Sequence, residues 1–122
     1  MTITNNQIYI YYQQLQEALV NETRALPAKV YFYILKNRQK LEEIVKSIEE
    51  SKLYIINKYN IQFDDSGNII SDENSAEMAN KELQELSSLI QEIDLATISL
   101  HDIENLDFTP QQMQALMFMI EE

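Results

Sequence analysis

The chain has 122 residues, enough for one domain, and 45% of them are hydrophobic, which excludes a disordered tail. One glycine, two prolines and no cysteine exclude a β-sandwich or barrel, disulfides, thiolate metal sites and cysteine nucleophiles. The net charge of −11 disfavours DNA binding by the surface as a whole, because two polyanions repel each other. We therefore expect a single, mainly α domain over residues 1–122.

The first predicted element is a helix that follows Asn5 and Asn6, either of which can act as its N-cap. The β-branched and aromatic residues of segment 7–11 would also suit a strand. The helix is favoured because apolar residues continue at helical spacing to the end of the segment, as Ile8, Tyr12, Leu15 and Leu19.

One long amphipathic helix is predicted from about residue 27 to residue 59. Pro27 suits a first helical turn, and nothing after it breaks a helix before Tyr59. Over about 32 residues the helix would span roughly 48 Å, a length typical of helices that pair with another chain or with antiparallel partners of their own. The apolar residues that fall on one side are Val30, Ile34, Leu41, Ile44, Val45, Ile48, Ile55, Ile56 and Tyr59.

This stripe predicts a homo-oligomer in which the long helix pairs with a second copy. Three polar residues, Asn37, Ser51 and Lys52, interrupt it. They either fix the register or oligomeric state, as a buried polar seam residue can, or mark places where the stripe reaches solvent. The predicted oligomer seam consists of Ile34, Asn37, Leu41, Ile44, Ile48 and Ile55.

The rest of the chain predicts two further helices and a minor β element. A hairpin is expected near 61–71 around Gly67, and a helix over 75–90 follows a polar linker. Alternating polar and apolar residues near 92–98 predict a strand, and the apolar spacing over 100–106 suggests one helical turn. The last helix begins at Thr109-Pro110 with Gln112 closing a capping box, which brings the shorter helices to three.

Charge is strongly segregated along the chain. Between Arg24 and Lys58 there are eight basic and four acidic residues, whereas fourteen acids and one base follow from Tyr59 onward. The acidic half could bind a basic groove on a partner by imitating the phosphates of a nucleic acid. Alternatively, it could neutralise the basic helix of the same chain or of a second copy.

Bases and aromatic residues alternate at the start of the long helix. Such a surface could hold a phosphate or a nucleotide base by charge and stacking. Alternatively, the aromatic rings pack on the first helix and the lysines are solvated. The residues of this predicted ligand-binding or partner-binding site are Arg24, Lys29, Tyr33, Lys36, Arg38 and Lys40.

The residues needed for catalysis are missing, so we expect no enzyme, no metal and no cofactor. His101 is the only histidine, which excludes a catalytic triad, and the pair His101-Asp102 is expected to be solvated. An EF-hand loop that began at Asp64 would need glycine and glutamate where the chain has Ile69 and Ser75. A hairpin turn therefore explains the acidic segment better than calcium binding does.

Several segments, taken in order, resemble small uncharacterised proteins of tailed phages and prophages of Gram-positive and gut bacteria. The segments are Leu-Pro-Ala-Lys-Val (26–30), Lys-Asn (36–37), Asn-Lys-Tyr (57–59), Asp-Ser-Gly-Asn (65–68), the run over 93–104 and Thr-Pro (109–110). The likeness spans most of the chain but contains no catalytic signature. It implies a viral setting without supplying an activity or any site residue.

Two functions are expected on these grounds. The first is a non-catalytic phage accessory protein that antagonises a host defence or replication protein or sequesters a nucleotide signal. The alternative is a virion morphogenesis factor, either a tail or capsid assembly chaperone or a minor structural subunit. In both cases the partner would be a host or phage protein, with a small nucleotide as a further candidate, and without direct contact to DNA or membrane. The expected location is the cytoplasm of the infected cell, because the N-terminus lacks the features of a secretory signal.

Overall fold

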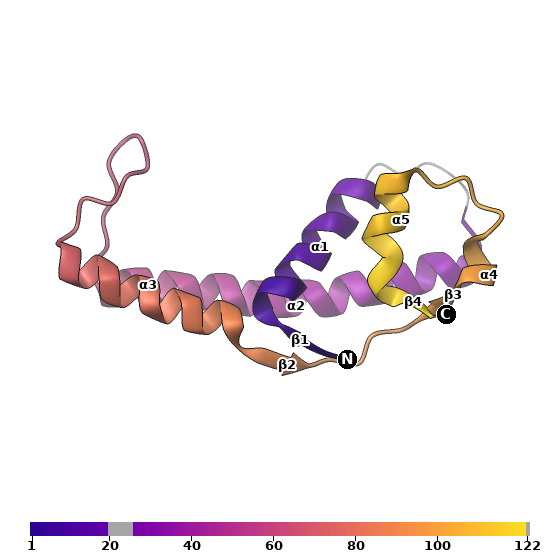
Figure 1. Ribbon diagram of the computed structural model, residues 1–122, viewed down its shortest axis with the longest axis horizontal. Helices are drawn as coiled ribbons and strands as arrows, with labels where there is room; N and C mark the ends of the chain where they lie inside the picture. The colour runs from indigo at the N-terminus through magenta and orange to yellow at the C-terminus, as the bar shows by residue number, and fades with distance from the viewer. Residues whose placement is uncertain (20–25, 122) are drawn as a thin grey trace.

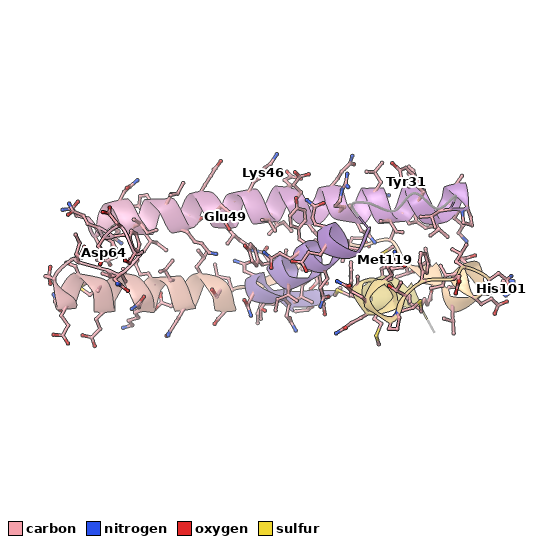
Figure 2. The ribbon with its side chains drawn as sticks, turned by 90° about the horizontal axis from the view of Figure 1, so that it is seen from above. Tyr31, Lys46, Glu49, Asp64, His101 and Met119 are labelled. Atoms are coloured by element: carbon pink, nitrogen blue, oxygen red, sulfur yellow. The ribbon has the colours of Figure 1, made fainter. Side chains whose placement is uncertain are left out.

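The computed structural model describes residues 1–19 and 26–121 and confirms a mainly α fold with a minor β component. The long α2 forms one layer, and a row of shorter helices lies along one side of it in the order α3, α1, α5 and α4 (Figures 1 and 2). The elements are β1 (Thr2–Thr4), α1 (Asn5–Leu19), α2 (Ala28–Lys58), α3 (Glu73–Ser88), β2 (Ile90–Glu92), β3 (Ile98–Ser99), α4 (Leu100–Ile103), α5 (Pro110–Leu116), the 3-10 turn η1 (Met117–Met119) and β4 (Ile120–Glu121).

The apolar stripe of α2 is the core of its own chain. Leu41 is fully buried and Ile34, Ile48 and Ile55 are at most 8% exposed, while Ile44 is half-buried against the same core. The prediction of an oligomer seam along this stripe is therefore wrong. Apolar periodicity shows which side of a helix is buried, but not whether the covering residues come from the same chain. Here they come from the row of shorter helices and the connecting segments.

Asn37 is fully buried and fixes a connecting segment against α2. Its amide nitrogen donates to the carbonyl oxygen of Ala96, and its amide oxygen accepts from the Ala96 N–H, both at 2.8 Å. Asn37 thus fixes the register of segment 93–97 against α2. One of the two interpretations of this residue was that it fixes a register, but here the register is within a single chain. Ser51 and Lys52 are half-buried, and the Lys52 ammonium lies 5.0 Å from the ring centroid of Tyr9 on α1.

The strand predicted near 92–98 is present only at its two ends. Ile93 still exchanges backbone hydrogen bonds of 2.9 and 3.0 Å with Met1, but Ala96 bonds to the Asn37 side chain and residues 94–97 belong to no strand. At one end β2 pairs antiparallel with β1, and at the other β3 pairs in parallel with β4. Both partner strands are only two or three residues long, too short to give a periodic signal in the sequence.

Capping boxes begin α1, α4 and α5. The predicted box of Thr109 and Gln112 is present, with reciprocal hydrogen bonds of 2.9 and 3.2 Å. In α1, however, Thr4 and Gln7 form the equivalent pair, so the prediction of an asparagine cap is wrong. Asn5 is instead buried, where it donates to the Leu86 carbonyl and accepts from the Gln91 side chain, and these bonds attach α1 to the end of α3.

The hairpin predicted near 61–71 is reduced to one bridge, between Phe63 and Ile69. Its turn is held by one oxygen of Asp64, which accepts the N–H groups of Ser66 at 2.9 Å and Asn68 at 2.8 Å. Gly67 has a φ of +85°, a conformation that suits glycine. The hairpin projects from the end of the molecule where α2 stops and α3 begins (Figure 1).

Asp72 caps α3 and makes its stability depend on pH. The hydroxyl of Ser75 and then its N–H lower the pKa of the Asp72 carboxyl. Because the pKa of Asp72 is lower in the folded state, its ionised cap stabilises the fold fully above the unfolded-state pKa of about 3.9. This stabilisation is lost as the pH falls through the folded-state pKa. We therefore expect Asp72→Ala to lower the melting temperature at neutral pH and to do so less at about pH 2.5.

Thermal unfolding followed by circular dichroism at the two pH values measures this difference. Asp65→Ala, which removes an exposed acid outside the cap, is the matched control and should change the melting temperature little at either pH. An equal loss for Asp72→Ala at both pH values would contradict a role for the ionised cap.

Candidate functional site

One end of the molecule has a small core of its own. We call residues 51–90 the distal limb; it comprises the last two turns of α2, the hairpin and α3 (Figure 1). Ile55, Ile61 and Ala79 form its buried centre, separate from the main cluster under α1 and α5. Such a small core cannot cover all the apolar side chains that the limb carries.

The distal limb leaves a large apolar surface uncovered. Isolated exposed apolar residues are common on any protein, but a concentration of them in one region marks an interaction surface. The exposed large hydrophobic residues of the limb are Leu53, Tyr54, Phe63, Ile69, Ile70, Met78, Leu89 and Ile90.

Part of this surface forms a shallow groove between α2 and α3. We call it the limb groove; its volume is about 290 Å³. Tyr54 and Leu89, which are 67% and 53% exposed, stand at its rim above Ile55 and Leu86. An open groove of this size fits one or two protruding side chains of a partner better than an enclosed small molecule. The lining residues are Ser51, Tyr54, Ile55, Glu82, Glu85, Leu86 and Leu89.

The rim of the limb groove is acidic. Glu82 accepts a hydrogen bond from the Lys58 ammonium at 3.0 Å, so its charge is paired within the chain. Tyr59 and then Lys58 lower the pKa of the Glu82 carboxyl, which is therefore ionised at neutral pH. The exposed carboxylate of Glu85 therefore gives the rim its negative charge, next to apolar lining residues.

The predicted basic site is not brought together. Arg24 lies outside the described residues. Lys29 pairs with Asp102 at 3.4 Å, and Lys40 donates to the backbone carbonyl of Asp94. Tyr33 packs against the main core, with its ring 5.7 Å from that of Phe32.

The remaining members of that site, Lys36 and Arg38, lie on different sides of α2. Residues two apart in a helix are about 200° apart around its axis, so the two cations cannot share one ligand. Lys36 is exposed, and Arg38 is half-buried. The bases and aromatic residues that alternate in the sequence therefore lie on different sides of α2 and do not form one site.

Part of the acidic half neutralises the basic helix of the same chain. Besides the contacts of Lys29 and Lys40, Lys58 at the other end of α2 pairs with Glu82. Exposed ion pairs contribute only about 0–1 kcal/mol each, so these contacts align segment 82–102 along α2 more than they stabilise it. The intramolecular interpretation of the charge segregation thus accounts for Lys29 and Lys58, whereas Lys40 bonds to a backbone carbonyl and most of the acids of α3 stay at the surface.

Other candidate chemistry is sparse. His101 is 86% exposed at its side chain and contacts Glu104 at 2.9 Å, whereas Asp102 belongs to the capping box of α4. The described residues contain no group of three or more histidines and acids that could hold a metal ion. Within the same residues, no helix combines the length and the apolar character that crossing a membrane requires.

Comparison with known proteins gave no matching family model, no similar curated protein and no similar solved structure.

Proposed function

We propose that the protein acts by binding another protein and that the distal limb is its contact surface. In this proposal it is an accessory protein of a tailed phage, and in the cytoplasm of the infected bacterium it occludes a host protein, with a defence protein as the best candidate. The sequence resemblance described above supplies the phage setting. The exposed apolar surface of the limb supplies the mode of action.

The single observation that carries the proposal is the limb groove with its negative rim. Tyr54 and Leu89 expose apolar surface at the edge of the groove, and Glu85 places an exposed carboxylate beside it, whereas the charge of Glu82 is paired with Lys58. A complementary partner carries a protruding apolar side chain flanked by lysine or arginine. Sequestration of a nucleotide has less support, because the cations that would hold the phosphates are dispersed along α2.

A role in virion morphogenesis is the second candidate, and the length of α2 favours it. The helix runs for 31 residues, about 46 Å, and the other described elements lie along one side of it (Figure 2). Such a rod suits a scaffold or an assembly chaperone. Purified particles that contain the protein, or assembly that stalls without it, would favour this function over the first.

Substitution of Leu89 by aspartate should reduce capture of the partner from infected cells at least about tenfold, since it places a charge where an apolar side chain is to be buried. Met117→Asp is the matched control, because Met117 is equally apolar and 67% exposed but lies in η1, outside the distal limb. Quantitative mass spectrometry of tagged wild type and both variants measures the effect. Equal capture by all three proteins would contradict a contact through the groove.

A further inference from the structure

The outer side of α2 carries a second regular pattern. Eight residues there alternate at spacings of four and three, and all eight side chains are exposed. The other elements lie on the opposite side of the helix, and Lys46 projects away from them (Figure 2). The eight positions, which we call the outer seam, are Phe32, Lys36, Gln39, Glu43, Lys46, Glu50, Leu53 and Asn57.

The eight positions have the spacing of the a and d positions of a heptad repeat, although only Phe32 and Leu53 are apolar and the other six are polar or charged. Phe32 and Leu53 are 56% and 59% exposed, and Tyr31 and Tyr54 beside them are equally open. Neither Glu43 nor Lys46 forms an ion pair with any other residue that the structure describes. All eight seam side chains are thus exposed in the part of the chain that the structure describes.

We propose that the outer seam binds a second copy of this chain in antiparallel orientation, about a two-fold axis between residues 44 and 45. In this register Glu43 faces the second copy's Lys46, and by symmetry Lys46 faces the second copy's Glu43. Gln39 meets the second copy's Glu50. The Leu53 side chain lies on the aliphatic stem of the second copy's Lys36.

Charge selects this arrangement over a parallel one. Parallel helices in register would place Glu43 against Glu43 and Lys46 against Lys46, whereas the antiparallel register turns both contacts into attractive pairs. One flanking contact opposes the dimer, because Glu42 and the second copy's Glu49 approach each other. The interaction is therefore of moderate affinity, and its orientation is set by the central pairs. The central pairs lie outside the limb groove, because neither Glu43 nor Lys46 lines it, although Tyr54 beside the end of the seam also stands at the groove rim.

A charge swap tests the central pairs. Lys46→Glu makes both symmetry-related contacts repulsive, and we expect it to raise the dimer dissociation constant at least about tenfold; Glu43→Lys should do the same. The double variant Glu43→Lys/Lys46→Glu restores both pairs and should return the constant to within about threefold of wild type. Sedimentation equilibrium over a concentration series measures the constants, and circular dichroism checks that each variant is folded.

Cysteine pairing tests the orientation, and the absence of native cysteine makes the result clear. An equimolar mixture of the full-length Gln39→Cys and Glu50→Cys chains should form a disulfide-linked heterodimer under mild oxidation, while each variant alone should link much more slowly. Faster linking of each variant with itself would indicate parallel helices and overturn the proposal. A wild type that stays monomeric at every concentration, or a double variant as weak as the single ones, would overturn it as well.

Discussion

Replacement of Asn37 by alanine should lower the free energy of unfolding by about 2–4 kcal/mol. The substitution removes both hydrogen bonds to Ala96 and leaves that N–H and carbonyl without partners beside α2. It also leaves a small cavity next to Met119, whose sulfur lies 3.5 Å from the Asn37 nitrogen. Denaturant unfolding measures the loss.

Asn57→Ala is the matched control, because it makes the same change at an exposed position on the same helix and should cost less than about 0.5 kcal/mol. A loss for Asn37→Ala as small as that of Asn57→Ala would show that the contact between Asn37 and Ala96 does not fix segment 93–97.

Ile55→Ala should destabilise the distal limb by about 2–4 kcal/mol. Ile55 is 7% exposed and belongs to a cluster whose other buried members are Ile61 and Ala79. Since this cluster is separate from the main core, we expect the loss to be local. Amide hydrogen exchange should lose protection in α3 while α1 and α5 keep theirs.

Leu53→Ala is the control for the limb, because Leu53 is two residues away and 59% exposed. Its exchange pattern in α3 should match that of wild type. Uniform loss of protection across all helices in Ile55→Ala would show that the limb unfolds only together with the rest of the chain. In that case the second cluster would not be an independent unit.

The helices were predictable because their signals are local. Thr109, Pro110 and Gln112 lie within one turn, and the limits of α2 differ from the predicted ones by a single residue at each end. The β pairs were not predictable, since β1 meets β2 across about ninety positions of sequence and each strand is very short. Turn residues and apolar periodicity are local signals, so they cannot predict that two distant segments pair.

The partner of the apolar stripe could not be inferred from periodicity alone. The stripe correctly marked Leu41 and Ile55 as buried, but their coverage by other elements of the same chain depends on tertiary packing. Asn37 was recognised as a residue that could set a register. Its partner, the Ala96 backbone, lies 59 positions away and has no sequence signature.

The two surfaces differ in how much of each was visible in the sequence. The limb groove depends on how α3 lies against α2, and no local pattern joins Tyr54 to Leu89. The outer seam consists of local positions on one helix, but the strong apolar stripe on the opposite side obscured it. The basic site failed for a simple geometric reason, because Lys36 and Arg38 are two residues apart and lie on different sides of the helix.

Site-specific photo-crosslinking in infected cells tests the central claim, that the distal limb is the contact surface, most directly. A photoreactive amino acid is introduced at Leu89 in one protein and at Met117 in another, since both positions are exposed and Met117 lies in η1, outside the distal limb. We predict an adduct with one defined protein from position 89 and none from position 117. An adduct from position 117 together with none from position 89 would contradict the account.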